Sequence, residues 1–315
     1  MTEFQETTAH AADDFILPFQ VGETSVRGKL VRLGASVDEI LSRHDYPEPL
    51  SQLTGQAAAL VAMVGSSLKF EGKLILQMQG DGPVSMLVAD YSAGGALRAT
   101  AKIAEGKEDV VAKARGAELH YLLAKGHMVM TIDQGPDMER YQGVTPLEGP
   151  DIATATINYF KQSEQIPTAI KLAVGRIEVP GKKPQWRAGG IMVQFMPGEG
   201  GGRDRGAAEL MREDDQEDWD NAEALLNTTN ADELLDPTLQ AEELLFRLYH
   251  ENGVRVFDGS SVHFECGCSR EKVENVLSRY DRADLEDMVE DGKIVVNCDF
   301  CREEYVFEVE EAEGD

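Results

Sequence analysis

The sequence has few cysteines and few basic residues, and each shortage excludes certain kinds of structure or partner. Only four cysteines occur in 315 residues, which excludes a disulfide framework spread along the whole chain. Lysine and arginine together number 30 against 57 acidic residues, and the formal net charge is −27. Nucleic acids and anionic membranes are bound through clusters of basic residues. We therefore expect neither nucleic acid nor membrane among the partners.

Long apolar runs are also missing. The N-terminal sequence MTEFQETTAHAADDF has no basic stretch followed by an apolar one, so no secretory signal is expected. The best candidate for a membrane span, LSQLTGQAAALVAMVGSSL at residues 50–68, is rich in Ala, Gly, Ser and Gln. Because a span needs ~20 mostly apolar residues, this composition indicates a helix buried inside the protein. We expect a cytoplasmic protein whose paired cysteines serve metal or redox chemistry.

The acidic charge is concentrated in the C-terminal part of the chain. Residues 1–197 hold 23 acidic and 19 basic side chains, residues 198–250 hold 15 and 4, and residues 251–315 hold 19 and 7. This shift predicts a domain boundary near Pro197. We expect an N-terminal core at 14–197, an acidic helical linker at 198–250 and a small C-terminal domain at 251–315. The first dozen residues are expected to form an extra tail.

The N-terminal part mixes strand and helix patterns, without a regular strand–helix–strand repeat or a phosphate-binding loop. We expect an α+β fold with β/α/β layers, in which helix 50–68 is covered on all sides because it lacks a polar face. Ser36 and Glu39 form a capping-box pattern that opens a short helix, and Asp151 is expected to cap another. Strands are expected at 25–33, 73–79, 84–91, 96–103, 127–133, 140–147, 168–174 and 186–195.

The linker begins with the glycine-rich stretch GEGGGRDRG and continues as acidic segments that carry leucines. Asp218 or Asp220 is expected to cap one helix, and Asp236-Pro237 to begin another. Two interpretations stay open. The segment forms ordinary amphipathic helices packed on a core, or it docks only marginally and comes loose, because like charges resist compaction.

All four cysteines lie in the last fifth of the chain, as Cys266-Gly-Cys268 and Cys298-Asp-Phe-Cys301. The C-terminal domain has few apolar residues, and domains below ~70 residues usually need a metal or disulfide staple. Two cysteine pairs can converge on one tetrahedral zinc ion, with iron as the minor alternative. His263 is a further candidate ligand, but an ordinary strand position is expected because four sulfurs already fill the shell. The predicted metal ligands are Cys266, Cys268, Cys298 and Cys301.

Short elements are expected around these cysteines. Residues 254–257 and 262–265 have strand character, and Ser269 is expected to cap a helix. Strands at 294–297 and 305–309 are expected to form a hairpin whose turn holds the second cysteine pair.

The one-residue spacing of the first pair is unusual, because structural zinc sites mostly place two to four residues between ligands. Two thiols this close can form a labile disulfide with each other, and Gly267 supplies backbone latitude for it. Cys298 and Cys301 can likewise pair locally. Zinc supplies ~10–16 kcal/mol of folding free energy in small peptides, whereas a whole domain is stable by ~5–15 kcal/mol. Oxidation would therefore remove all four ligands and unfold the module.

The order of the two motifs, with 29 residues between them, resembles the heat-shock protein 33 family of redox-switched chaperones. The resemblance continues through Ser269-Arg-Glu and covers about residues 14–310, although the tract 198–206 and its acidic continuation are longer than expected for the family. Matching segments lie at 79–83, 139–143, 159–168, 188–190 and 245–250.

The resemblance implies an ATP-independent holdase of the bacterial cytoplasm, which is not an enzyme. In such proteins the reduced form holds zinc and is inactive. Oxidants then form two local disulfides, here Cys266–Cys268 and Cys298–Cys301, release the zinc and unfold the linker. The active form, usually a homodimer, binds unfolding client proteins. Linker leucines and the sheets of the first domain are candidates for the client surface.

Three other interpretations remain. A thiol-disulfide oxidoreductase could use the second pair, but no thioredoxin-like strand–helix pattern surrounds it. A zinc-ribbon module could bind nucleic acid, but the C-terminal domain is strongly acidic. A purely structural zinc site would resist peroxide.

Overall fold

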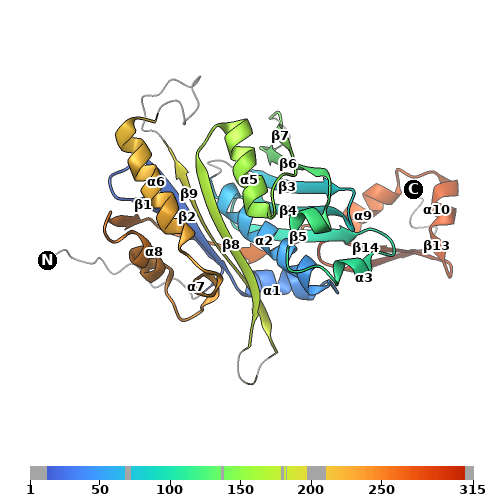
Figure 1. Cartoon of the computed structure of the whole chain (residues 1–315). Coiled ribbons are helices and arrows are strands. Elements are labelled where there is room, and N and C mark those ends of the chain that lie inside the picture. Colours follow the sequence, from blue (N-terminus) through green and yellow to red (C-terminus); the bar gives the residue numbers. More distant parts are fainter. Residues whose placement is uncertain are drawn as a thin grey trace. The chain divides into compact units, whose positions relative to one another are not determined.

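The computed structural model describes residues 13–67, 72–135, 138–178, 181, 183–196 and 211–308. The chain divides into two compact units, Met1–Phe264 and Glu265–Asp315, and Figure 1 labels most of their elements. The expected N-terminal tail and the expected flexible tract 198–206 lie outside the described residues.

Two six-stranded sheets form most of the first unit. The first sheet consists of β1 (Phe15–Val21), β2 (Val26–Leu33), β8 (Thr168–Ile177), β9 (Gln185–Phe195), β10 (Val254–Val256) and β11 (Ser260–Ser261). Its order is β10-β1-β2-β9-β8, with β11 also paired to β1, and its pairings are antiparallel.

The second sheet consists of β3 (Lys73–Gly80), β4 (Val84–Ser92), β5 (Ala96–Ile103), β6 (Gly126–Asp133), β7 (Tyr141–Pro146) and β12 (His263–Phe264). Its order is β12-β5-β4-β3-β6-β7. Strand β12 joins β5 in parallel, whereas the other pairings are antiparallel. The strands therefore follow the alternating patterns of the sequence, and the α+β class is correct.

Helix α2 (Glu48–Gly65) packs against strands of both sheets and lies between them in Figure 1. Its glycines explain how the sheets approach it so closely. A Cβ atom added at Gly55 would lie 2.9 Å from Val174 Cγ1 in β8, and one added at Gly65 would lie 2.7 Å from Tyr91 Cδ1 in β4. Larger side chains at these positions would push the sheets away from the helix. Among the described residues, no helix is long and apolar enough to cross a bilayer.

The C-terminal end of α2 is capped by a lysine from the first sheet. Lys29 of β2 donates hydrogen bonds of 2.8 Å to the Met63 carbonyl and to Ser66 Oγ, and another to Ser67 Oγ. A cation at this position stabilises the negative end of the helix dipole. Burial lowers the pKa of Lys29 to about 7. The helix ends at Gly65, three residues before the expected end at residue 68.

Helix α1 (Ala35–Ser42) has a different cap from the expected one. Ser36 lies inside the helix and Gly34 is its N-cap residue. The capping oxygen comes from Asp14, whose Oδ1 accepts hydrogen bonds of 3.0 Å from the N–H groups of both Gly34 and Ser36. The expected cap at Asp151 is confirmed. The other helices of this part are α3 (Glu108–Val111), α4 (Leu119–Leu122), α5 (Ile152–Tyr159) and the π-helix η1 (Phe160–Glu164).

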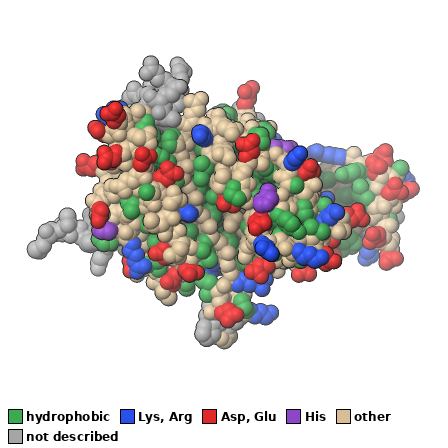
Figure 2. Space-filling view, in the orientation of Figure 1, with side chains coloured by type: hydrophobic (Ala, Val, Ile, Leu, Met, Phe, Trp, Pro, Cys, Tyr) green, Lys and Arg blue, Asp and Glu red, His purple; other side chains and the backbone are tan. Residues whose placement is uncertain are grey.

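The linker forms three helices, α6 (Glu213–Asn227), α7 (Ala231–Leu235) and α8 (Ala241–Tyr249). They pack on the first sheet and build a second hydrophobic core with its strands. The linker side chains that are buried in this core include Trp219, Leu226, Leu234, Leu244, Leu245, Leu248 and Tyr249. Acidic side chains gather on the outer surface of α6 (Figure 2). The linker is thus docked in this state.

The linker helices begin elsewhere than expected. Asp218 and Asp220 lie inside α6, whose first turn is closed by a capping box between Arg212 and Asp215. Pro237 lies between α7 and α8 and begins neither. Both expectations were drawn from single residues with helix-start character, and several acidic residues in this segment share that character.

Residues 254–264, which we call the strap, pair with strands of the first unit and belong to it rather than to the C-terminal unit. Strands β10 and β11 of the strap pair with β1, and β12 pairs with β5. The first unit therefore extends to Phe264, beyond the boundary expected at residue 251. The sequence indicated the strands correctly, but strand character does not identify the pairing partner.

The second unit is small. It contains α9 (Arg270–Leu277), α10 (Arg282–Asp287) and a sheet of β13 (Val289–Glu290), β14 (Lys293–Asn297) and β15 (Glu304–Glu308). Ser269 caps α9, as expected, by accepting from the N–H of Lys272. The buried cluster of the described part consists of only Leu277, Leu285, Ile294 and Phe307. Four buried side chains give little hydrophobic stabilisation to a separate unit.

Candidate metal centre

The second cysteine pair is held in a tight turn between β14 and β15. The N–H of Cys298 donates to the Glu303 carbonyl over 2.9 Å, and the Cys298 carbonyl accepts from the Arg302 N–H over 2.8 Å. Arg302 has a φ of 60°, the left-handed conformation that closes such turns. The backbone thus fixes both sulfurs of the pair on the same turn, as the spacing predicted.

The first pair lies in the segment that leads into α9. Gly267 separates the two cysteines, and its carbonyl accepts a hydrogen bond from Lys272 Nζ. A Cβ atom added at Gly267 would lie 3.5 Å from Lys272 Nζ, which is ordinary contact. In this state the position therefore tolerates a larger residue. The backbone latitude of Gly267 for disulfide formation stays a prediction.

The four cysteine sulfurs converge on one point. Their Sγ atoms all lie within 4.8 Å of one another, and all four residues are in the thiol form. Cys266 Sγ is 3.7 Å from Cys298 Sγ, and Cys268 Sγ is 3.3 Å from Cys301 Sγ. A tetrahedral zinc ion with ~2.3 Å bonds holds its sulfurs ~3.8 Å apart. The donor set and its spacing thus fit one metal ion with four thiolate ligands.

The electrostatics of the cluster also favour a cation. Burial and the three neighbouring thiols raise the pKa of the Cys301 thiol, although a hydrogen bond from the backbone of Glu303 opposes this. Without a cation the buried Cys301 side chain is therefore favoured as a thiol rather than as a thiolate. A bound metal ion would favour the thiolate instead, because it would coordinate and stabilise the deprotonated sulfur.

Two residues outside the predicted ligand set support the cluster. The Tyr305 hydroxyl donates to Cys268 Sγ over 3.2 Å, and this hydrogen bond raises the pKa of Tyr305. Arg270 lies over the Phe307 ring at 4.3 Å and donates to the Val306 carbonyl over 2.9 Å, which ties α9 to β15. Sequence reasoning missed Tyr305, although its place next to the CxxC turn was a usable signal.

His263 lies in β12 of the first unit, in register with Ala96. This is the strand position that the sequence favoured for it over a role as ligand.

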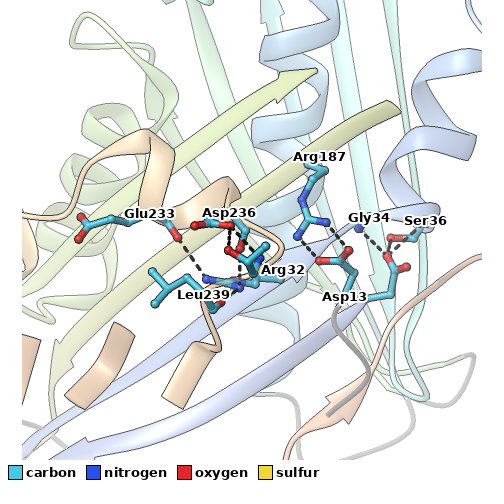
Figure 3. Close-up of polar contacts among 10 residues, drawn as sticks. Asp13, Arg32, Gly34, Ser36, Arg187, Glu233, Asp236 and Leu239 are labelled. Carbon is cyan, nitrogen blue, oxygen red and sulfur yellow. Dashed lines mark hydrogen bonds and ion pairs between the residues drawn. The ribbon is translucent and has the colours of Figure 1, made fainter. Parts of the chain in front are cut away.

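A buried arginine anchors the linker to the first sheet (Figure 3). Arg32 of β2 is 2% exposed, and its guanidinium donates to three linker carbonyls. Nη2 bonds Glu233 over 3.1 Å, and Nη1 bonds Asp236 over 3.0 Å as well as Leu239. All three carbonyls belong to α7 and the loop that follows it. Burial and the nearby Arg187 lower the pKa of Arg32. Sequence reasoning did not single out this residue.

A second buried arginine lies beside the first. Arg187 of β9 forms a two-pronged ion pair with Asp13 (Figure 3). Burial raises the pKa of Asp13 in spite of this pair. Arg187 thus has an acidic partner, whereas the guanidinium of Arg32 donates to backbone carbonyls of the linker. Arg32 therefore depends on the docked linker for its hydrogen bonds.

Comparison with known proteins shows which family the chain resembles. A family model described as "Hsp33 protein" matches residues 14–308. A 33 kDa chaperonin of Caulobacter vibrioides is 45% identical over 309 residues, which cover 97% of this chain and 98% of that protein. A 33 kDa chaperonin of Aliivibrio salmonicida is 36% identical and covers 91% of this chain and 89% of its own length.

A solved structure agrees. The crystal structure of the 33 kDa chaperonin of Thermotoga maritima superposes with a TM-score of 0.74 at 26% identity. It covers 95% of this chain and 97% of the Thermotoga chain. Hsp33 is a family of chaperones and not of enzymes. The chain belongs to the Hsp33 family.

Proposed function

We propose that this chaperone is a redox-regulated, ATP-independent holdase with one zinc ion in its reduced form. The observation that carries the proposal is the convergence of four sulfurs within 4.8 Å in a unit whose buried cluster has only four side chains. Such a unit depends on its metal for stability, because metal binding supplies folding free energy. The zinc ligands are Cys266, Cys268, Cys298 and Cys301.

Oxidation removes this support. Each disulfide, Cys266–Cys268 and Cys298–Cys301, forms when two thiolates lose two electrons to peroxide, which takes up two protons and leaves as two molecules of water. The four donor atoms are then consumed and the metal is released. Each disulfide closes a ring of only three or four residues, which constrains little of the unfolded chain. The second unit therefore unfolds.

The linker is the second part of the switch. Its helices cover one face of the first sheet with leucine and aromatic side chains, while its outer surface is acidic. Unfolding of the linker exposes this apolar surface, which binds unfolding client proteins and prevents their aggregation. The oxidised form acts as a homodimer in the cytoplasm. Nucleic acid and membrane are not among its partners, in line with the net charge of −27.

The proposal is tested by exposing the reduced, zinc-loaded protein to peroxide at a mild heat-shock temperature. Released zinc is followed with a chromogenic chelator, helix content by circular dichroism, and client protection by light scattering of a chemically unfolded enzyme. Zinc release, loss of helix and suppressed scattering are expected together. Zinc release with full aggregation of the client would exclude holdase activity, and resistance to peroxide would indicate a purely structural metal site.

Cys266→Ser tests the ligand set separately. Loss of one thiolate should weaken zinc binding and loosen the second unit even under reducing conditions, because the serine hydroxyl is a weaker zinc ligand than a thiolate. Zinc affinity is measured by competition with a chelator of known affinity. An unchanged affinity would remove Cys266 from the site.

A further inference from the structure

The strap lies between the two segments that the proposed function unfolds. It follows the linker helix α8, which ends at Tyr249, and it is followed directly by Glu265 and Cys266. Once the linker and the second unit have unfolded, the strap is attached to folded structure only through its own contacts.

Those contacts are few and mostly made by the backbone. The strap pairs with β1 through three residue pairs of β10 and two of β11, and with β5 through two of β12. Three further hydrogen bonds run from Phe257 N to Pro18 O (2.9 Å), from Val262 N to Asp14 O (2.8 Å) and from His263 N to Gly95 O (2.9 Å). By comparison, β8 and β9 share ten residue pairs.

The side chains of the strap add a limited set of contacts. Val254 and Val256 pack against the core that the linker builds with the first sheet, so they lose part of that packing when the linker unfolds. Phe264 packs against the other core, with Arg43 5.0 Å from its ring centroid.

Val262 is the most deeply buried side chain of the strap, at 4% exposure. Phe257 is 38% exposed, and the serines of β11 and His263 are exposed as well. Short pairing with only partial side-chain burial has low local stability. The strap can therefore leave the sheets without unfolding the first unit.

Departure of the strap would free the outer edge of β1, where the strap pairs with five residues, and the outer edge of β5 at Ala96 and Leu97. In the first sheet β1 has β2 on its other side, and in the second sheet β5 has β4 on its other side. These two strands span seven and eight residues. An uncovered strand edge presents a row of N–H and C=O groups that a new strand can pair with.

We propose that the outer edges of β1 and β5 are docking sites for extended segments of unfolded polypeptides, which add to the sheets as new strands. The proposal rests on the proposed function and names where clients bind. The strap itself shows that the edges accept short strands in both directions, because it is antiparallel to β1 and parallel to β5. Pairing through the backbone does not require a particular sequence, which suits clients that share no motif.

A peptide pair tests the mode of binding in the full-length protein. The first is a ten-residue peptide of alternating threonine and valine, and the second has the same sequence with every second amide N-methylated so that it cannot pair as a strand. Oxidised protein is expected to bind the first at least tenfold more tightly. Equal affinities would overturn strand addition while leaving holdase activity intact, and absent client protection would instead contradict the proposed function.

Hydrogen exchange locates the sites. The amides of β1, and those at the Ala96–Leu97 end of β5 where the strap pairs, should be protected in the reduced zinc-bound protein, exchange faster after oxidation, and become protected again with a chemically unfolded client. Continued protection after oxidation would show that the edges stay covered and would overturn the proposal. Protection that returns without client and rises with protein concentration would assign the edges to a second copy of the chain, which also overturns it.

A variant in the strap tests the role of the strand edges without changing the cysteines. Phe257→Pro removes the N–H that bonds the Pro18 carbonyl, whereas Phe257→Ala removes the same ring and keeps the donor. In the reduced protein, with zinc content unchanged, the proline variant should show faster exchange in β1 and tighter binding of the unmethylated peptide than the alanine variant. Faster exchange without any gain in peptide binding would contradict a docking role for β1.

Discussion

Tyr305 is the residue that joins the sulfur cluster to the β15 strand. Its hydroxyl donates to Cys268 Sγ over 3.2 Å. Groups that hydrogen bond to metal ligands orient them and tune their affinity for the metal. A residue beside the CxxC turn thus contacts the sulfur cluster although it is not one of the four cysteines.

Tyr305→Phe should therefore lower zinc affinity by about 10–100-fold, the usual effect of removing such a partner. Tyr280→Phe is the matched control, because Tyr280 belongs to the same unit and is 45% exposed. Affinities are compared by chelator competition under reducing conditions. Equal affinities of the two variants would show that the hydroxyl does not act on the metal site.

Lys29 gives a pH dependence that can be measured. Burial lowers its pKa to about 7 from 10.5, so between these values the unfolded chain binds a proton that the folded chain does not. Stability should therefore rise with pH in this window, by at most ~1.4 kcal/mol per pH unit. Below pH 7 both states are protonated and the slope vanishes.

The measurement compares thermal unfolding of the first unit in the wild type and in Lys29→Met from pH 7 to 10. The difference between them should grow in favour of the wild type as pH rises. Lys113→Met removes an exposed lysine and should leave the pH dependence unchanged. A constant difference between wild type and Lys29→Met would contradict the lowered pKa.

At the scale of elements, the linker is held by its leucines and by one arginine. The leucine-bearing faces of α6, α7 and α8 were visible in the sequence as an open choice between packed helices and a loosely docked segment, and the structure describes the docked state. Arg32 connects three carbonyls of this linker to β2. The anchor acts at one place, α7 and the loop that follows it.

Arg32→Met should release that part of the linker. Each buried carbonyl left without a donor costs about 1–3 kcal/mol, which is a large share of the free energy that holds a marginal segment. We expect faster hydrogen exchange in α7 and α8 and client protection by the reduced protein, with zinc still bound. Arg27→Met, at an exposed position of the same strand, is the control. Unchanged exchange in α7 would show that the leucines alone hold the linker.

The strap and the helix caps show where local patterns fail. Residues 254–257 and 262–265 had strand character, yet their partners β1 and β5 lie far away in the sequence. Helix α1 takes its cap from Asp14 rather than from Ser36. Both depend on contacts that form only when distant segments meet, so local propensity could not predict them.

At the scale of the whole molecule, the two units differ in what stabilises them. The first has two extensive hydrophobic cores, whereas the described part of the second has a cluster of four buried side chains. A unit that binds metal only when folded is stabilised in proportion to the logarithm of the metal concentration. The unit at 265–315 should therefore respond to metal, and the core of the first unit should not.

Chelation under reducing conditions tests this difference. Removal of the metal should abolish a separate unfolding transition of the second unit and leave the main transition of the first unit within a few degrees, since a change of ~1 kcal/mol moves the midpoint of such a domain by ~2–4 °C. Scanning calorimetry records both transitions. Tryptophan fluorescence reports the first unit alone, because Trp186 and Trp219 both lie there. A second unit that keeps its transition without metal would contradict the proposed switch.

The sequence by itself determined the class of fold and which four sulfurs come together. The spacing of the cysteines, the acidic charge and the apolar helix 50–68 are local or compositional features, and they were sufficient to predict the α+β class, the sulfur cluster and the buried helix. Only the tertiary structure decided that Arg32 holds the linker, that Tyr305 bonds a sulfur and that the strap closes both sheets. Each of these depends on which distant segments become neighbours, and that choice is made by the packing of the whole chain.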